Sequence, residues 1–368
     1  MADPTPRTEE EVLEAIERRR RRPRRKLMAE QVTLSHGAGG KASHDLVEAL
    51  FLAEFRNPLL EPLADAAIFE ADGTSAAAAR LAFSTDSYVV KPLFFPGGDI
   101  GELSVNGTVN DLAMAGARPL CLSAGFIVEE GFPVEDLRRV AASMARAAAA
   151  ADIAVATGDT KVVERGKADG LYVNTAGVGV VRHDLDLGPS RMETGDRVLV
   201  SGTLGDHGMA IMVARGELEL EVKLQSDTAA LHGLAATLVE TVGERLRCLR
   251  DPTRGGLATV LAELALGADL AIALDEAALP VRPEVTGACE ILGIDPLYVA
   301  NEGKLCAVVA PERADDALAA LREHDLGRDA AIVGEVRDDP PGLVLLETTF
   351  GGSRVVDMLA GDPLPRIC

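Results

Sequence analysis

The stretch FSTDSYVVKPLFFPGGDIGELSVNGTVNDLAMAGARP, residues 83–119, carries the clearest local pattern in this chain of 368 residues. The β-branched and aromatic residues over Arg80 to Val90 predict a strand. Pro96-Gly97-Gly98 then predicts a loop, and Glu102 to Ala115 predicts a helix that ends at Gly116. A strand, a loop and a helix in this order predict one layered unit of sheet and helix.

Similar elements follow on both sides of this stretch. Further strands are predicted at 120–128, 172–181, 197–201, 269–274, 305–309 and 331–335, and further helices after 41, at 134–151, within 225–245 and after 256. A chain of 368 residues is long enough for two domains with filled cores. We therefore predict a two-domain α+β or α/β fold, with a mixed sheet in the N-terminal domain and an α/β C-terminal domain.

Stretches rich in charge, glycine or proline set the expected domain limits. We predict a basic, disordered extension over residues 1–29, an N-terminal domain over 30–188, a C-terminal domain over 189–348 and a flexible tail over 349–368. The basic run from Arg18 to Lys26 is interpreted as a solvated tail, although contact with nucleic acid or an acidic partner stays open.

Composition narrows the classes of function. A net charge of −21 and the lack of Trp argue against a nucleic-acid-binding protein, which needs a basic face and aromatic stacking surfaces. Five cysteines without a CxxC pair argue against a disulfide framework or a zinc site and favour a reducing compartment. No apolar run reaches the roughly 18 residues that span a bilayer. We therefore expect a cytoplasmic protein that binds neither membrane nor nucleic acid.

A glycine cluster near the N-terminus is the first candidate binding element. In His36-Gly37-Ala38-Gly39-Gly40-Lys41 the small residues allow backbone N–H groups to approach an anion, and Lys41 adds positive charge. The spacing does not match a Walker A loop, which would need Gly at position 35 and Ser or Thr at position 42. Taken alone, the cluster is more typical of an ordinary turn than of an anion-binding loop.

A set of aspartates within or beside apolar segments is the second candidate. Asp65, Asp86, Asp111, Asp159 and Asp251 occupy surroundings in which a carboxylate is costly unless it is paired, hydrogen-bonded or bound to a cation. If they converge, they could hold Mg²⁺ together with the phosphates of a nucleotide. Each one alone could instead be a helix cap or a loop anchor.

Three further residues are candidates for the chemical step. Lys161 could stabilise developing negative charge, and Glu302 could accept a proton, although each alone could be a surface residue. Cys368 is the last residue, and its thiolate could attack an activated carbonyl. It could also be incidental. The remaining histidines form no HxxxH or Cys/His pattern, which argues against a catalytic metal centre or a serine triad.

Together these motifs resemble one known family. From about Val32 to Cys368 the chain is similar to the HypE family of hydrogenase maturation proteins, within the aminoimidazole ribonucleotide synthetase superfamily. The resemblance rests on residues 83–119 and on LSHGAGGK (34–41), TGDTKVVERG (157–166), SGTLGDHG (201–208), DPTRGG (251–256), ANEGKL (300–305) and PRIC (365–368). The basic N-terminal extension lies outside it.

The resemblance implies a homodimer in which the N-terminal domains bind ATP and form a shared barrel, with a mobile tail that ends in Cys368. It implies that Lys161 and Glu302 act beside that tail. It implies Mg²⁺ ligands at Asp65, Asp86, Asp111 and Asp251. It implies nucleotide contacts from Gly37, Gly39, Gly40, Lys41, Thr85, Asp86, Asn110, Asp111, Asp159 and Thr160.

The resemblance also implies a reaction and its partners. The carbamoyltransferase HypF would place a carbamoyl group on Cys368. ATP would phosphorylate the carbamoyl oxygen, a base would remove the protons on nitrogen, and a thiocyanate would result. Its cyanide would pass to iron on the HypC–HypD complex and become a ligand of the [NiFe] hydrogenase active site.

Three rival functions remain at this stage. A selenophosphate synthetase of the same superfamily would need a reactive Cys or Sec near the glycine cluster, and residues 35–41 have none. A thiamine monophosphate kinase would not account for the terminal PRIC. A non-enzymatic carrier that only displays Cys368 would not need the set of aspartates, and ATP turnover would distinguish it.

Overall fold

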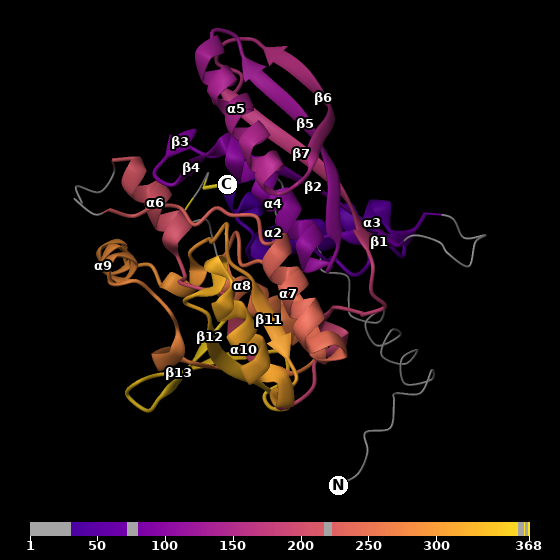
Figure 1. Ribbon diagram of the computed structural model, residues 1–368. Coiled ribbons are helices and arrows are strands. Elements are labelled where there is room, and N and C mark those ends of the chain that lie inside the picture. The colour runs from indigo at the N-terminus through magenta and orange to yellow at the C-terminus, as the bar shows by residue number, and fades with distance from the viewer. Residues whose placement is uncertain (1–30, 72–79, 217–222, 360–363, 365–366) are drawn as a thin grey trace.

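The computed structural model describes residues 31–71, 80–216, 223–359, 364, 367 and 368, and the extension predicted for 1–29 lies outside these residues. The described chain forms two sheets with flanking helices, and the C-terminus lies where the two halves meet (Figure 1). This arrangement confirms the two-domain α+β architecture. The limits 30–188 and 189–348 stay predictions, and residues 182–196 connect the two sheets.

The first sheet is mixed, as predicted. Its strands, in spatial order, are β1 (Ala67–Glu70), β2 (Arg80–Tyr88), β7 (Leu171–Val181), β5 (Arg118–Glu129) and β6 (Ala154–Val163). Neighbouring strands are antiparallel except β5 and β6, which are parallel. The short strands β3 (Phe94–Phe95) and β4 (Gly98–Asp99) pair separately at the entry to the first long helix.

Two helices, α4 (Ile100–Met114) and α5 (Val134–Ala150), cover one face of this sheet (Figure 1). The helix α4 begins at Asp99, whose carboxylate accepts hydrogen bonds from the backbone N–H groups of Gly101 and Glu102 at 2.8 and 3.1 Å. It is buried on almost every side because the second domain packs against it as well. Any polar side chain on α4 therefore needs a defined partner.

Apolar side chains are exposed on the opposite face of the first sheet, where Phe83 and Ile127 are 43% and 44% exposed. The strand β6 lies at the edge of the sheet, and each of its residues from Ala154 to Val162 is exposed. In the described part of the single chain, this face and edge are not covered.

The second sheet is also mixed. Its strands, in spatial order, are β14 (Ser353–Val356), β13 (Val344–Glu347), β10 (Ala271–Asp275), β12 (Ala331–Arg337), β8 (Arg197–Val200), β11 (Cys306–Val309) and β9 (Leu246–Arg250). Within the described strands of this second sheet, only β10 and β13 pair in parallel. The predicted α/β domain is therefore an α+β domain, because an alternation of strands and helices in sequence does not specify strand direction.

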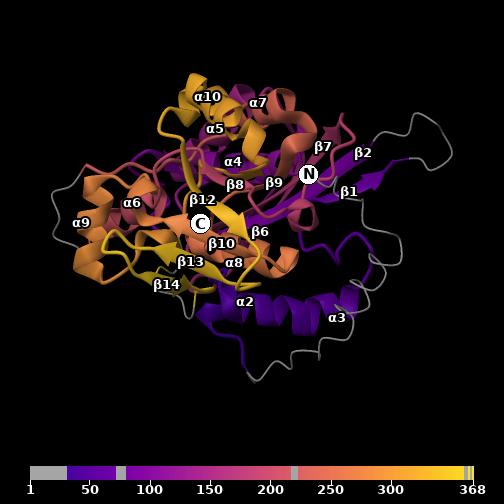
Figure 2. The same ribbon diagram turned by 90° about the horizontal axis from the view of Figure 1, so that it is seen from below.

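Five helices pack with this second sheet or beside it. They are α6 (Asp206–Ala214), α7 (His232–Val242), α8 (Gly256–Ala268), α9 (Pro283–Leu292) and α10 (Ala314–Glu323). The N-terminal segment forms α2 (Lys41–Leu46), a π-helical turn (Val47–Phe51) and α3 (Leu52–Phe55), and it runs along the outside of the molecule below β1 in Figure 2. None of the described helices is long and apolar enough to cross a membrane.

Part of the predicted flexible tail, 349–368, belongs to the second sheet. Residues 348–352 form a tight turn, with Gly351 at a φ of 86°, and β14 pairs antiparallel with β13 beyond it. Val356 and Met358 are buried at the end of this hairpin. The expectation of a mobile arm starting at residue 349 is thus wrong over 353–356, because four residues of β14 suffice to extend an existing sheet.

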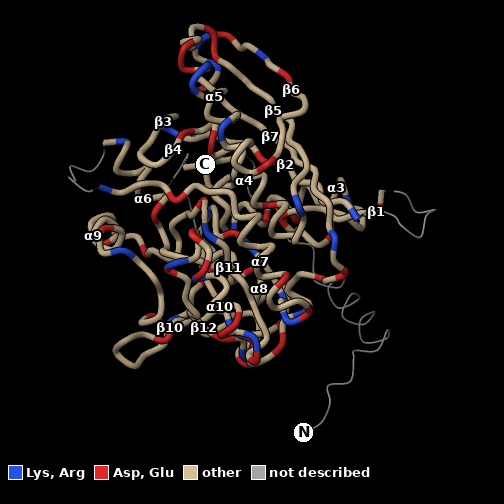
Figure 3. The backbone as a smooth tube through the Cα atoms, viewed as in Figure 1, with Lys and Arg blue, Asp and Glu red and all other residues tan. Residues whose placement is uncertain are grey.

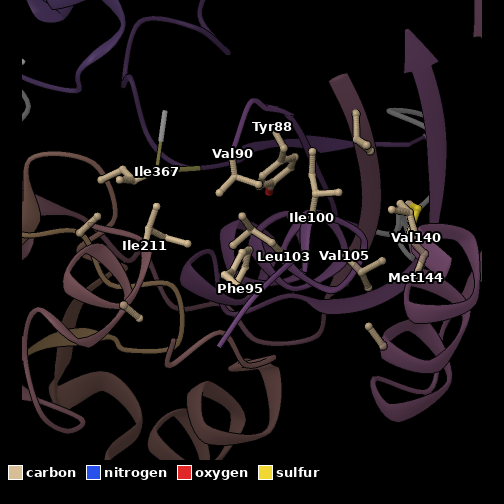
Figure 4. Close-up of a cluster of buried hydrophobic side chains, with 14 of the residues drawn as sticks. Tyr88, Val90, Phe95, Ile100, Leu103, Val105, Val140, Met144, Ile211 and Ile367 are labelled. Carbon is tan, nitrogen blue, oxygen red and sulfur yellow. The ribbon is translucent and has the colours of Figure 1, made fainter. Parts of the chain in front are cut away.

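A hydrophobic cluster joins the two domains to the end of the chain. It includes Leu103 from α4, Ile211 from α6, Val285 from α9 and the penultimate residue Ile367, and Figure 4 shows Ile367 near Ile211. The end of the chain is therefore packed into the core that both domains share.

Acidic and basic residues are interspersed along the described chain (Figure 3).

Candidate functional site

A cavity of about 410 Å³ lies where the first sheet, α4 and the start of α8 meet. Most of the residues that line it have polar side chains. The lining residues are His36, Gly37, Gly39, Ser43, Val47, Asp65, Ser84, Thr85, Asp86, Gly107, Asp111, Arg250, Asp251, Thr253, Arg254, Thr259, Val260, Glu263, Glu302 and Cys368. Segments 36–47, 65–111, 250–263 and the two residues Glu302 and Cys368 thus converge on one site.

The predicted magnesium ligands all line this cavity. Burial raises the pKa of Asp111 well above its usual range, and the charges of Asp251, Asp65 and Asp86 add to the increase, against a hydrogen bond of 2.5 Å from Ser84 Oγ. Burial likewise raises the pKa of Asp251 to about 7, with Asp65 adding to it. The pocket therefore concentrates carboxyl groups that a bound cation would favour in their ionised form.

One of these carboxylates already has a partner. Arg250 Nε lies 3.1 Å from Asp65 Oδ1, and Arg250 Nη2 lies 2.9 Å from Glu263 Oε2. Burial still raises the pKa of Asp65 to about 6, with Arg250 opposing the increase and Glu263 adding to it. Asp65 consequently has less free charge to offer a metal ion than Asp111 or Asp251 has.

The terminal cysteine lies inside the pocket. The Cys368 thiol is half-buried, and its pKa is raised well above the usual value, first by burial and then by the nearby charge of Glu302, against the effect of Arg254. Glu302 is 3% exposed, and its Oε1 atom makes no hydrogen bond within the described chain. Burial and the charges of Asp86, Asp251 and Asp227 raise the pKa of Glu302 well above its usual range. A buried carboxyl with a free oxygen thus lies next to the terminal thiol.

Arg254 is the residue that the sequence interpretation missed. Its guanidinium lies 3.5 Å from both Asp86 Oδ1 and the carbonyl oxygen of Gly37, and the negative groups of Cys368, Asp86 and Glu302 raise its pKa. The signal was present, because Arg254 stands in the motif DPTRGG. Only the fold shows that this arginine is directed to the end of the chain.

The glycine cluster divides between two roles. Gly37 and Gly39 line the cavity, and Gly39 has a φ of 75° while packing so closely on Arg254 that a Cβ atom would lie 2.6 Å from Arg254 Cβ. Gly40 instead packs on the backbone of Leu359, and the backbone N–H of Lys41 donates to the Leu359 carbonyl at 2.9 Å. Neither Gly40 nor Lys41 is among the described residues that line the cavity.

Two other predicted nucleotide contacts sit at the pocket wall or behind it. Thr85 lines the cavity and donates to the carbonyl oxygen of Thr175 at 3.0 Å. The Asn110 amide is buried in α4, donates to the carbonyl oxygen of Ala229 at 3.0 Å and accepts from the N–H of Leu231 at 2.7 Å. Asn110 thus joins α4 to the second domain, and it is not among the residues that line the cavity.

The remaining candidates lie away from this cavity. Asp159, Thr160 and Lys161 are exposed on the edge strand β6, where Lys161 Nζ lies 2.7 Å from Asp159 Oδ2. The Asp159 carboxylate also accepts from the N–H of Thr160 at 2.9 Å, and these bonds to Lys161 and Thr160 lower its pKa. Within one chain, Lys161 and Glu302 are therefore not brought together.

The donor set fits a magnesium nucleotide better than a bare protein-bound metal. Over the described residues, no three His, Cys, Asp or Glu side chains are grouped closely enough to hold a metal ion by themselves. Mg²⁺ commonly takes one or two carboxylates and completes its coordination with water and phosphate oxygens. The aspartates can supply such a partial ligand set, and Arg254 can contact phosphate oxygens beside it.

Comparison with known proteins identifies both domains. Residues 64–181 match the family described as AIR synthase related protein, N-terminal domain, and residues 193–345 match its C-terminal domain. The carbamoyl dehydratase HypE of Bradyrhizobium diazoefficiens is 56% identical over 337 residues, which cover 92% of this chain and 96% of the relative. Its counterpart in Escherichia coli is 49% identical over 337 residues, covering 92% and 99%.

Solved structures of HypE proteins are also similar to this chain in sequence and fold. HypE in a HypE–HypF complex has 47% sequence identity and a TM-score of 0.79, covering 85% of this chain and 99% of that one. HypE in complex with ATP has 47% identity and a TM-score of 0.76, covering 92% and 100%. The thiamine monophosphate kinase of Aquifex aeolicus, at 18% identity and a TM-score of 0.60 with 84% and 96% covered, shares the fold.

Proposed function

The chain belongs to the HypE family of carbamoyl dehydratases, which serve hydrogenase maturation, and we propose that the group it dehydrates is carried on its own Cys368. The observation that carries this proposal is the position of Cys368 in the polar cavity beside Glu302 and Arg254. A cysteine that only presents a group to partner proteins would be expected at the surface, not among buried carboxyl groups.

The proposed reaction starts from a carbamoyl group bonded to the Cys368 sulfur. The γ-phosphoryl group of ATP is transferred to the carbamoyl oxygen, which converts a poor leaving group into phosphate. Loss of two protons from nitrogen and departure of the phosphate leave a carbon–nitrogen triple bond. The products are the Cys368 thiocyanate, ADP and phosphate, and the carbamoyl oxygen ends in the phosphate.

The neighbours of Cys368 suit this chemistry. Glu302 has a raised pKa and a buried Oε1 atom with no hydrogen-bond partner among the described residues, so it can accept a proton from the carbamoyl nitrogen. Arg254 carries fixed positive charge beside the thiol and can stabilise the negative charge that develops on oxygen. Glu302 is therefore proposed as the base, with Arg254 as an additional electrostatic group.

ATP and Mg²⁺ would occupy the same cavity. The relative solved with ATP supports nucleotide binding, and the aspartate set supports a divalent cation. Asp111 and Asp251 are the proposed principal ligands, with Asp86 beside Arg254 and Asp65 held by Arg250. When bound, Mg²⁺ supplies charge compensation for the transferred phosphoryl group. Gly37 and Gly39 provide open backbone for the phosphates.

Two partner systems follow from the chemistry. A carbamoyltransferase must load Cys368, and the relative solved with HypF supports that protein as the donor. An iron-carrying acceptor must take the cyanide, for which the HypC–HypD complex is proposed. The site of action is proposed to be the cytoplasm.

A homodimer would complete the site. A shared barrel between two copies would cover the exposed face of the first sheet, with Phe83 and Ile127, and the free edge β6, where Val162 is exposed. The same association would carry Lys161 of β6 to the pocket of the second copy. Lys161 would then act on the neighbouring tail rather than on its own.

Mixing two inactive variants tests this arrangement. Lys161→Ala and Cys368→Ala are each expected to lose dehydration, but subunit exchange should restore about a quarter of the wild-type rate per total chain, because one intact site forms in each mixed dimer. The measurement is thiocyanate formation after exchange, with the exposed Lys167→Ala as a matched control that keeps full activity.

If Lys161 serves the tail of its own chain, no mixed dimer contains a complete site, and the mixture stays inactive. A chain that sediments as a monomer at its mass of 38.6 kDa would equally refute the trans arrangement.

Coupling of ATP use to the loaded tail distinguishes a dehydratase from a carrier that only displays Cys368. With the carbamoylated chain, we expect one ADP for each thiocyanate in a single turnover. ADP formation by the unloaded chain should be slower by about 10² or more, because the phosphoryl acceptor is missing. ATP that binds without any ADP release by the loaded chain would favour the carrier.

A further inference from the structure

The motif SGTLGDHG contains a histidine that the proposed reaction does not use. His207 lies at the start of α6 with no exposed surface. Its Nδ1 atom is 2.8 Å from Ser226 Oγ, and its Nε2 atom is 2.6 Å from the carbonyl oxygen of Ile367. The Phe95 ring packs edge-on against the imidazole at a centroid distance of 5.7 Å. His207 is thus fixed on both sides and directed at the residue before Cys368.

The partners of the ring determine where its proton lies. A carbonyl oxygen can only accept, so Nε2 carries the proton and donates it to Ile367. Nδ1 then accepts from the hydroxyl of Ser226, whose oxygen also accepts from the N–H of Thr228 at 3.1 Å. Burial lowers the pKa of His207, against the influence of Asp227 and the Ile367 carbonyl, which is consistent with a neutral ring.

The Ile367 side chain provides a second attachment. It is 6% exposed and belongs to the hydrophobic cluster that includes Ile211 and Val90, and Figure 4 shows these three side chains in one region of the cluster. A polar contact on the backbone and an apolar contact on the side chain together hold one residue in a defined place. The residue held is the one next to the reactive thiol.

We propose that His207 is a positioning residue, which holds the penultimate carbonyl and so determines where Cys368 stops in the pocket. The inference rests on the proposed function, since it assigns His207 a role in presenting the carbamoyl group. An extended chain advances about 3.3–3.6 Å per residue, so a slip of one residue would move the sulfur away from Glu302 and Arg254. Reacting groups tolerate little displacement of this kind.

Alkylation of Cys368 tests the attachment without using the dehydratase reaction. In a Cys121→Ser background, which removes the other cysteine that is not fully buried among the described residues, Cys368 is treated with iodoacetamide and followed by peptide mass spectrometry. His207→Phe keeps an aromatic ring against Phe95 but has no donor. Alkylation should become about tenfold faster, as expected for the loss of one buried hydrogen bond.

His207→Gln is the matched conservative variant, because its amide can still donate near the Nε2 position. Its alkylation rate should lie between those of the wild type and His207→Phe. With the carbamoylated chain, His207→Phe should slow dehydration about tenfold or more at saturating ATP while leaving the affinity for ATP unchanged. His207→Gln should recover part of that rate. A residue with only a structural role would not show this ordered recovery.

Ile367→Ser guards against a folding defect, since it alters only the tail and should raise alkylation of Cys368 as His207→Phe does. The proposal is overturned if His207→Phe, folded as judged by its melting temperature, leaves the alkylation rate unchanged. It is also overturned if alkylation rises in both variants while dehydration keeps its normal rate. Failure of the wild type to dehydrate a loaded tail would count against the proposed function and leave the alkylation result intact.

Discussion

A Glu302→Gln chain should accept the carbamoyl group at the normal rate and then dehydrate it about 10²–10⁴ times more slowly, the range typical for loss of a general base. Glu302 is almost fully buried beside Cys368, and in the described part of the chain its Oε1 atom has no hydrogen-bond partner. Glutamine has nearly the same shape but cannot accept the proton. The measurement is single-turnover conversion of the carbamoylated tail, with the exposed Glu323→Gln on α10 as control.

The pH dependence of the wild-type dehydration rate should also report the ionisation of Glu302. Burial and neighbouring carboxylates raise the pKa of Glu302, so the proportion of active carboxylate increases with pH and the rate should increase with it. The Glu302→Gln variant should lose this dependence. An unchanged rate in Glu302→Gln would remove Glu302 from the mechanism and leave the base to be found elsewhere, with Lys161 of the neighbouring copy as the next candidate.

An Asp251→Asn chain should bind ATP in the presence of Mg²⁺ at least about 100-fold more weakly, because it loses one charged ligand in a site that has few. Asp251 is 6% exposed and lies among three other aspartates of the same cavity. Calorimetry with a non-hydrolysable ATP analogue, with and without Mg²⁺, measures the effect. The exposed Asp316→Asn serves as control.

The same substitution should stabilise the chain when no nucleotide is present. Because the pKa of Asp251 rises from about 4 unfolded to about 7 folded, the folded state retains a proton in this window and loses stability as pH increases through it. Asparagine has no charge to bury. Asp251→Asn should therefore melt a few degrees higher above pH 7, since about 1 kcal/mol corresponds to roughly 2–4 °C, and should melt with the wild type near pH 4.

Equal affinity for the magnesium nucleotide in both chains would show that the aspartates are not its ligands. A lower melting temperature of the variant above pH 7 would show that the Asp251 charge is already compensated within the protein.

Local pattern was sufficient for the elements that position the pocket. The strand β2 and the helices α4 and α5 were predicted within a few residues, because β-branched and aromatic residues mark the strand and Pro or Gly marks helix ends. The α+β character of the second domain was not predictable, because strand direction depends on pairings such as β8 with β11 and β12. The hairpin of β13 and β14 was missed because β14 has only four residues.

Convergence of the site was predictable only in part. The family resemblance assigned five residues to one site, and all of them line one cavity: Asp86, Asp111, Asp251, Glu302 and Cys368. It could not reveal Arg254, whose role depends on a contact across the domains. Nor could it reveal that His207 would meet the carbonyl of Ile367, since 160 residues separate them in sequence.

The central claim, that Cys368 carries the group being dehydrated, is tested most directly by mass spectrometry of the C-terminal peptide. The chain and its Cys368→Ala variant are incubated with the carbamoyltransferase, carbamoyl phosphate and ATP, and Mg-ATP is then renewed. The account predicts a gain of about 43 Da on Cys368 alone, followed by a loss of about 18 Da that requires Mg-ATP. A tail that stays unmodified while ATP is hydrolysed, or an equal gain in Cys368→Ala, would contradict it.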